Sequence, residues 1–351
     1  MMPLQVPYIE TEYYCQSLKP YFQDLVVPMV WVYAEEVYRF MPTYNWDRFS
    51  EVFPTAWTAS AYKGADGPTA SVPNVQKRLN NNLNWLEVMS NEESKFKDHG
   101  FQGIVITGWS RYDHFAVLAE LLPPALPSLA TNLLSVKHGY FNSSWQKEYY
   151  KALECADNSR LYEEFIDLES DPLLQEKMSW CFFPGSAIFK MIHNLGTVQS
   201  EVSQYLHKYS AQEGWITEYN IRHNYSSPFR VNEGLDEYSR MSYLLTALIK
   251  QAQTALAEVY DHHTVSEWIE QKIYPLHKDL NDFKARAESL KSRNTWPRRP
   301  FPVIKAVQAI LTSTTTSTTA NPPENQDPVT VRPKRLVQAP DYYRHPRPKD
   351  E

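Results

Sequence analysis

The side chains best suited to chemistry stand together in the middle of the chain. They directly follow an apolar run, residues 103–107 (GIVIT), and they are Trp109, Arg111, Tyr112, Asp113 and His114. Aromatic rings can stack on the apolar face of a ligand, while guanidinium, carboxylate and imidazole groups can hold its polar groups. These residues are therefore the first candidates for a functional site.

An apolar run without alternating polar residues is typical of a parallel strand that is covered on both faces. We expect residues 103–109 to form such a strand, with the polar cluster at its carboxyl end. Substrates of α/β barrels and open α/β sheets bind at that end, because the βα loops gather there. The polar cluster is thus expected at the end of the strand where ligands of such folds bind.

Two further strand and helix pairs precede this segment. The pattern predicts a strand at residues 26–33 followed by a helix at 45–53, and a strand at 55–62 followed by a helix at 75–89. A further helix is predicted at residues 113–122, after the strand at 103–109. One face of the second helix is apolar, with Val75, Leu79, Leu83 and Leu86. The opposite face is polar, with Asn80, Asn81, Asn84 and Glu87. Three consecutive βα units predict a parallel sheet with right-handed crossovers.

Helical periodicity replaces the strand signals after Pro127. Helices are expected at residues 127–137, 144–153, 186–210, 238–259 and 264–290, the last with a kink at Pro275. From residue 294 the chain is rich in Pro, Thr and Arg and too poor in apolar residues to stay ordered. We therefore expect an α/β domain (1–125), a helical domain (126–293) and a disordered tail (294–351).

Composition excludes several function classes. The 351 residues are 42% hydrophobic, enough for a core, and carry a net charge of −6, which argues against nucleic acid as the main partner. Only 10 glycines occur, without GxGxxG, GxxxxGK[ST] or GxSxG, so a phosphate cradle or a nucleophilic serine is not indicated. His263 and Glu267 have the i, i+4 spacing of metal ligands, but polar residues at a helix start explain them more simply. No cofactor and no metal are expected.

The cysteines and the N-terminus predict an intracellular protein. Cys15, Cys155 and Cys181 are odd in number and form no CxxC pair, so we expect buried free thiols. The first residues lack a signal peptide, and no run of 18 apolar residues could span a membrane. We expect a protein of the cytoplasm or nucleus without a membrane partner, while its oligomeric state stays open.

Four segments in the same order carry a family resemblance. They are PMVWVYAE (28–35), WTASAYKGADGPTASVP (57–73), NNLNWLEV (81–88) and GIVITGWSRYDHFAVLAELLPPALPSL (103–129). With the later FPGSAIF (183–189), they resemble hexosaminidases of glycoside hydrolase family 20 over about residues 26–290. The resemblance implies the last three βα units of a (β/α)₈ TIM barrel, followed by a helical domain.

The resemblance also implies an activity. Family 20 enzymes release terminal β-linked N-acetylglucosamine or N-acetylgalactosamine, and the acetamide oxygen of the sugar itself attacks the anomeric carbon. An Asp-Glu pair supplies the acid chemistry, and aromatic side chains from later strands surround the acetamide. A carbohydrate substrate of this N-acetylhexosaminide class is therefore the expected partner.

On that pattern the substrate-binding residues can be assigned. Trp109 would form the floor of the terminal-sugar subsite, and Tyr33, Trp31 and Trp57 would line it. Arg111 and Asp113 would hold sugar hydroxyls. Each residue has a simpler role too: the aromatic side chains can pack in the core, and Asp113 can cap its helix.

No catalytic residue can be assigned. The pairs Glu35-Glu36 and Asp236-Glu237 are expected on solvated faces, and the Asp-Glu pair of the family lies upstream of the matching region. Because a full barrel takes roughly 250 residues, we expect a fragment of a longer hexosaminidase that does not hydrolyse hexosaminides alone. The alternative is a non-catalytic carbohydrate-binding or scaffold protein derived from such an enzyme.

Overall fold

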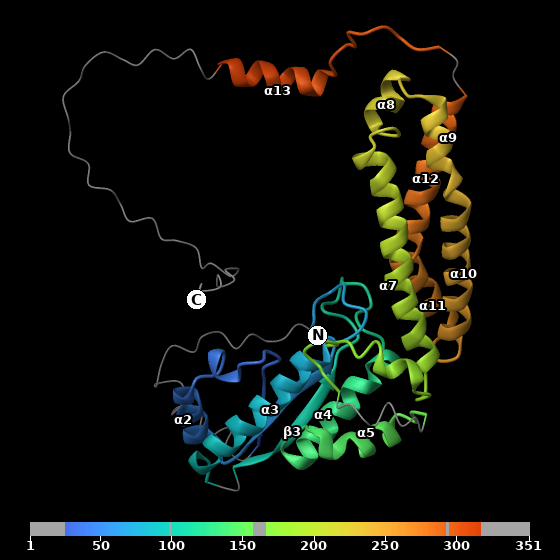
Figure 1. The fold of residues 1–351 in the computed structure, drawn as a ribbon. Coiled ribbons are helices and arrows are strands. Elements are labelled where there is room, and N and C mark those ends of the chain that lie inside the picture. Colours follow the sequence, from blue (N-terminus) through green and yellow to red (C-terminus); the bar gives the residue numbers. More distant parts are fainter. Residues whose placement is uncertain (1–24, 98–99, 157–165, 293–294, 317–351) are drawn as a thin grey trace, which may run out of the picture. The chain divides into compact units, whose positions relative to one another are not determined.

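The computed structural model of the protein describes residues 25–97, 100–156, 166–292 and 295–316 (Figure 1). The chain divides into two compact units, Met1–Pro297 and Arg298–Glu351, and each is described by itself. In the described residues no helix is both long and apolar enough to cross a membrane.

A three-stranded parallel sheet lies in the first unit. Its strands are β1 (Met29–Trp31), β2 (Ala56–Lys63) and β3 (Phe101–Gly108), in the order β1-β2-β3. Met29 pairs with Trp57, and Ala59 pairs with both Trp31 and Val105. The predicted strands and their parallel arrangement are confirmed. The sheet is open rather than closed into a barrel, because β1 and β3 both lie at its edges.

Three helices accompany this sheet: α2 (Thr43–Val52), α3 (Val75–Glu92) and α4 (Leu126–His138). Helix α3 begins where the Asn74 side chain accepts a hydrogen bond from the main-chain nitrogen of Lys77 at 3.0 Å. Between sheet and helices lies an aromatic core in which the buried rings of Trp46 and Trp85 meet edge to face. This core fixes the side of the sheet on which the helices lie.

Asparagine side chains connect the sheet to α3, and this corrects the predicted polar face of that helix. Asn81 is fully buried rather than solvent-facing, as is its neighbour Asn82. The Asn82 side chain accepts from the Ser60 hydroxyl at 2.6 Å and donates to Asn132 of α4 at 2.9 Å. Amides can replace apolar residues here because each finds a partner, so burial leaves no unpaired polar atom.

The helix predicted at residues 113–122 does not form. This stretch is an irregular loop, closed by an antiparallel bridge between Arg111 and Leu118 and by a hydrogen bond from Ala119 N to Ser110 O at 2.9 Å. The apolar periodicity that predicted a helix arises because Leu121 packs into the core of the helical part. The helix after β3 is instead α4, which begins beyond Pro123 and Pro124.

The second half of the unit is helical, as predicted. Its helices are α5 (Gln146–Ala152), α7 (Ser186–His207), α8 (Glu218–His223), α9 (Pro228–Asp236), α10 (Tyr238–Ala257), α11 (His262–Lys272) and α12 (Tyr274–Lys291). A π-helical turn (Lys208–Gln212) extends α7. Short 3₁₀ turns lie at Val37–Arg39, Glu93–Lys95, Pro123–Ala125, Ser143–Trp145 and Lys177–Trp180.

Helices α7, α9, α10 and α12 lie lengthwise against one another as an elongated bundle (Figure 1). Its apolar core includes Leu245 of α10 and Leu280, Phe283 and Leu290 of α12. The helix predicted at 264–290 is in fact two helices that meet at Ile273, because Pro275 occupies the first turn of α12. Proline there starts a new helix rather than kinking a continuous one.

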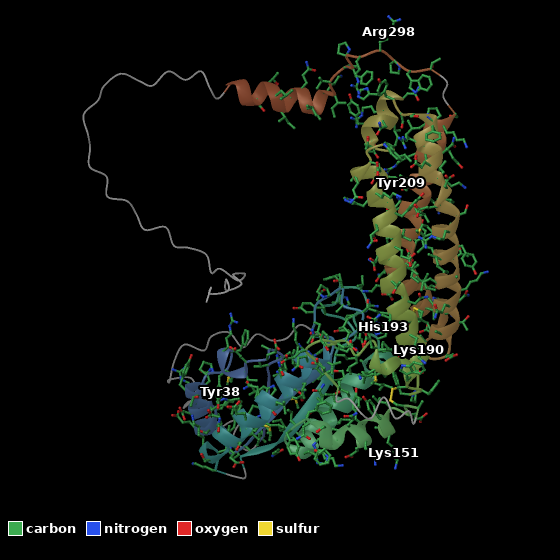
Figure 2. All side chains as sticks on the ribbon, in the orientation of Figure 1. Tyr38, Lys151, Lys190, His193, Tyr209 and Arg298 are labelled. Carbon is green, nitrogen blue, oxygen red and sulfur yellow. A yellow bond between two sulfur atoms is a disulfide. The ribbon has the colours of Figure 1, made fainter. Side chains whose placement is uncertain are left out.

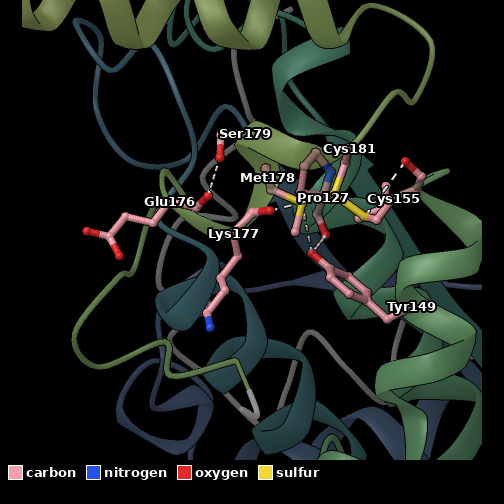
Figure 3. The surroundings of a disulfide bond; sticks show 9 residues. Pro127, Tyr149, Cys155, Glu176, Lys177, Met178, Ser179 and Cys181 are labelled. Atoms are coloured by element: carbon pink, nitrogen blue, oxygen red, sulfur yellow. Dashed lines mark hydrogen bonds between the residues drawn. A yellow bond between two sulfur atoms is a disulfide. The ribbon is translucent and has the colours of Figure 1, made fainter. Parts of the chain in front are cut away.

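Cys155 and Cys181 form a disulfide bond, so the prediction of free thiols was wrong for these two (Figure 3). Main-chain hydrogen bonds from Ala156 to Trp180 (3.0 Å) and from Phe182 to Glu154 (3.2 Å) hold the two segments side by side. The two cysteines are 26 residues apart, and their spacing alone did not indicate the pairing. Cys15 lies outside the described residues.

The second unit contains one described helix, α13 (Lys305–Thr316). Its presence corrects the prediction of a tail without structure for these residues. Ala306, Val307, Ile310 and Leu311 supply the helical apolar periodicity that the tail's overall composition concealed. Residues 317–351, the rest of the predicted tail, lie outside the described part of the chain.

Candidate functional site

The carboxyl ends of the three strands bring two predicted site residues together. Tyr33 follows β1, Trp109 follows β3, and the centroids of their rings lie 6.2 Å apart at an interplanar angle of 59°. The Trp109 side chain is 41% exposed, so part of its indole face is open to a ligand. The Tyr33 hydroxyl is buried and has no hydrogen-bond partner among the described residues. A half-open aromatic pair with an unused hydroxyl is the central feature of the site.

Helix α3 holds the end of β1, and with it Tyr33. The side-chain amide of Asn81 donates to the carbonyl oxygens of Val32 (2.9 Å) and Ala34 (2.6 Å). The guanidinium group of Arg78 donates to the Tyr33 carbonyl oxygen at 3.0 Å. These three contacts fix the backbone on both sides of Tyr33, so its ring is presented by a rigid support.

The end of β2 holds Trp109. The main-chain nitrogen of Trp109 donates to the Lys63 carbonyl oxygen at 3.3 Å, and the Lys63 ammonium group donates to the Trp109 carbonyl oxygen. Gly64 packs so closely on the Trp109 backbone that a Cβ atom would collide with it. Its φ of +77° also favours glycine. The tight turn after β2 therefore serves as the seat of Trp109.

Lys63 and Glu120 are buried charged residues near the turn that follows β2. Lys63 is 3% exposed and Glu120, from the loop after β3, is 1% exposed. Burial lowers the pKa of Lys63, and Glu120 opposes that shift. Burial likewise raises the pKa of Glu120, with Asp66 adding to the rise and Lys63 and nearby main-chain N–H groups opposing it. Sequence reasoning missed Glu120, although a lone carboxylate within the apolar stretch FAVLAELLPP is a usable signal of a buried charge.

Arg111 and Asp113 are engaged with the protein itself. The Arg111 guanidinium group forms an ion pair with Glu267 of α11 at 2.7 Å and donates to the Ala116 carbonyl oxygen at 3.0 Å. One carboxylate oxygen of Asp113 accepts from the main-chain nitrogens of Phe115 (2.8 Å) and Ala116 (3.0 Å). Both residues shape the loop after β3, and Asp113 caps a turn there.

The two remaining predicted residues lie at different places on the sheet. Trp31 is the last residue of β1 and its side chain is 44% exposed. Trp57 lies near the amino end of β2, where its indole nitrogen donates to the Gln102 side chain at 2.8 Å. Trp31 ends its own strand but pairs with Ala59 in the middle of β2. Neither Trp31 nor Trp57 is therefore level with Trp109 at the carboxyl end of β3.

The two acidic pairs lie outside the aromatic site. Glu35 and Glu36 are exposed, and Glu35 accepts from the Asn80 side chain at 3.0 Å. Glu237, at the end of α9 in the bundle, pairs with Lys208 at 3.3 Å and accepts from Tyr209. Asp261 caps α11, as polar residues at a helix start do. In the described residues no group of three or more His, Cys, Asp or Glu could hold a metal ion.

A hollow of about 570 Å³ lies elsewhere, along α7. Figure 2 shows His193, one of its lining residues, on this helix. The rest of its lining is Ser71, Val72, Leu173, Gln175, Ile192, Gly196, Thr197, Ser200 and Glu201. Burial lowers the pKa of His193, and Asp171 opposes the shift. This lining has no aromatic ring besides the imidazole, so the hollow lacks the stacking surface of the strand-end site.

Comparison with known proteins gives two relatives and no match to a protein-family model. The chain is 28% identical over 279 residues to human hexosaminidase D, covering 79% of this chain and 54% of that protein. Over 119 residues it is 38% identical to bovine hexosaminidase D, covering 34% of this chain and 33% of the relative. The chain thus spans about half the length of the human relative and a third of the bovine one. It is distantly similar to hexosaminidase D, a resemblance at the level of the glycosidase family.

Proposed function

We propose that this chain carries the sugar-binding part of a β-N-acetylhexosaminidase and binds a terminal β-linked N-acetylhexosamine at the ends of its three strands. The observation that carries the proposal is the Tyr33 and Trp109 pair at 6.2 Å, half open and seated on rigid turns. Indole faces suit the C–H surface of a sugar ring and the methyl group of an acetamide. The similarity to hexosaminidase D supports the same ligand class.

Each residue of the site then has a role. Trp109 is the platform for the sugar ring, the Tyr33 ring stands beside it as a wall of the acetamide pocket, and Trp31 forms an outer wall. Arg111 and Asp113 define the rim through the loop that they shape. Trp57 supports the sheet from its other end.

We further propose that the three βα units are the last three of a (β/α)₈ barrel. The parallel order β1-β2-β3, in which β1 and β3 each pair only with β2 among the described residues, is what three consecutive barrel strands would show apart from the other five. In a substrate-assisted reaction the acetamide oxygen attacks the anomeric carbon, and a carboxylic acid protonates the departing oxygen. In the part of the chain that the structure describes, no adjacent Asp-Glu pair lies at the proposed site to supply that acid. The chain alone therefore binds the sugar without cleaving it.

Binding is tested by calorimetric titration of the full chain with N-acetylglucosamine. We expect saturable binding that Trp109→Ala weakens at least tenfold, because the stacking surface is lost. Trp180→Ala is the matched control, since Trp180 is exposed but lies beside the disulfide rather than at the strand ends. Equal affinity of the two variants, or no binding by the unmodified chain, would refute the sugar site.

Catalysis is tested separately with 4-nitrophenyl N-acetyl-β-glucosaminide. We expect the purified 351-residue chain to release no chromophore. Release at a rate that Trp109→Ala abolishes would show that the chain contains its own general acid, and the binding-only proposal would be abandoned.

A further inference from the structure

Lys63 has a buried ammonium group that contacts the Trp109 backbone. Its side chain is 3% exposed, and its Nζ atom donates to the main-chain carbonyl oxygen of Trp109. In return Trp109 donates its main-chain N–H to the Lys63 carbonyl oxygen at 3.3 Å. Lysine is rarely buried to this degree, because removing an ammonium group from water is costly unless it gains partners. The reciprocal contact with Trp109 is one such partner.

A second charged group near Lys63 is the Glu120 carboxylate of the loop after β3, which is 1% exposed and raises the pKa of Lys63 by its charge, although neither of its oxygens has a hydrogen-bond partner among the described residues. Two other charged groups reach the same carboxylate. Asp66 adds a negative charge but is paired with Arg78 at 3.2 Å. Lys272 of α11 adds a positive charge and donates to the Thr69 carbonyl oxygen at 3.1 Å. Among these groups, Lys63 is the one whose ammonium group hydrogen-bonds to the Trp109 backbone.

We propose that Lys63 is a positioning residue for the strand-end site, whose hydrogen bond to the Trp109 carbonyl oxygen fixes Trp109 beside Tyr33. A methylene chain capped by a neutral group would fill the same space but would leave the Trp109 carbonyl without its donor. The expected effect of Lys63 on sugar binding rests on the proposed function. Its expected effect on the position of Trp109 rests only on the contacts described above.

The experiment follows Trp109 by ¹⁹F NMR in the full chain labelled with 5-fluorotryptophan. The Trp109 line is assigned by its absence in Trp109→Phe. We expect Lys63→Met to shift or broaden this line and Lys63→Arg, which keeps the charge and the donors, to move it less. Lys77→Met is the matched control, because Lys77 is exposed at the start of α3, and it should leave the line unchanged. A Trp109 line that Lys63→Met does not move, or that Lys63→Met and Lys63→Arg move equally, overturns the proposal.

Titration of the same samples with N-acetylglucosamine separates the positioning role of Lys63 from the proposed sugar binding. We expect the Trp109 line of the unmodified chain to move with added sugar, and Lys63→Met to weaken that binding at least tenfold. If the unmodified chain binds no sugar while Lys63→Met still displaces Trp109, the proposed function fails and the positioning role stands. If the sugar binds Lys63→Met and the unmodified chain equally, the positioning role fails and the proposed function stands.

Glu120→Gln provides an independent test and decides the matter should Lys63→Met fail to fold. Burial lowers the pKa of Lys63 and the Glu120 charge opposes this, so removing that charge lowers it further. We expect the Trp109 line to change with pH, as Lys63 loses its proton, at a lower pH in Glu120→Gln than in the unmodified chain. A midpoint that stays or rises contradicts the role of Lys63, because Trp109 would then not sense its charge.

Discussion

At the scale of single residues, the site is built from groups whose roles depend on partners far away in the sequence. Lys63 contacts a residue 46 positions away, and Asn81 holds a carbonyl oxygen 49 positions away. Arg111, predicted to hold sugar hydroxyls, is paired with Glu267, 156 positions along the chain. Residue type indicated that these side chains were able to do chemistry, but only their partners show which of them remain open to a ligand.

His193 should make the stability of the fold sensitive to mild acid. Because burial lowers its pKa, the folded chain binds fewer protons than the unfolded chain. The unfolded histidine gains its proton below about pH 6.5, so the free energy of unfolding should fall as the pH falls through that region. We expect His193→Gln to lose part of this dependence in urea unfolding at pH 7.5 and 5.5, while His207→Gln, an exposed residue of the same helix, keeps it. Identical pH dependence in both variants would show that His193 is not responsible.

At the scale of elements, the helical bundle holds the loop that follows β3. The Arg111 and Glu267 ion pair joins this loop to α11, and the main-chain nitrogen of Leu122 donates to the Tyr260 hydroxyl at 3.3 Å. Because both charged side chains are about one third exposed, water and salt screen their attraction and the pair contributes little stability by itself. The packing of Leu121 into the bundle core is the stronger restraint on the loop.

A second restraint between elements is the disulfide that closes the segment between α5 and α7. Cys181 is buried next to Met178, and the Met178 sulfur lies 4.0 Å from the hydroxyl of buried Tyr149 (Figure 3). Closing a loop of this length stabilises the folded state by about 3 kcal/mol, mainly by restricting the unfolded chain.

We expect the Cys155→Ser, Cys181→Ser double variant to unfold at lower urea concentration by about that amount. Dithiothreitol should produce the same loss in the unmodified chain and no further loss in the double variant. Non-reducing peptide mapping should find the Cys155 to Cys181 link. Equal stability with and without reductant would mean that the bond is not formed in solution.

At the scale of the whole molecule, the sheet is open, with a strand at each edge. Its edge strands β1 and β3 each pair only with β2 among the described residues, and Met29 and Trp31 of β1 are each 44% exposed. Unpaired strand edges with apolar side chains promote pairing with other chains. The outer edges of β1 and β3 are therefore surfaces on which a strand of another chain could add.

The chain should therefore self-associate as its concentration rises. We expect sedimentation velocity to show this, and Met29→Lys to reduce it, because a charge on an edge strand opposes strand addition. Phe40→Lys is the matched control, since Phe40 is exposed but lies outside the sheet. A concentration-independent monomer, or an equal effect of the two substitutions, would show that the edge of β1 is not the contact.

The sequence by itself determined most of the local elements and the position of Trp109 at the end of a strand. Three parallel strands, the helices between and after them, and Trp109 at a strand's carboxyl end all follow from apolar periodicity within short windows. The tertiary structure alone decided four other features. These are the burial of Asn81, the loop in place of a helix at residues 113–122, the disulfide, and the seat of Trp109 on Lys63 and Gly64. Each of these features depends on partners that are distant in sequence, so local periodicity does not predict it. A buried polar group such as the Asn81 amide, for example, is tolerated only where the fold supplies its partner.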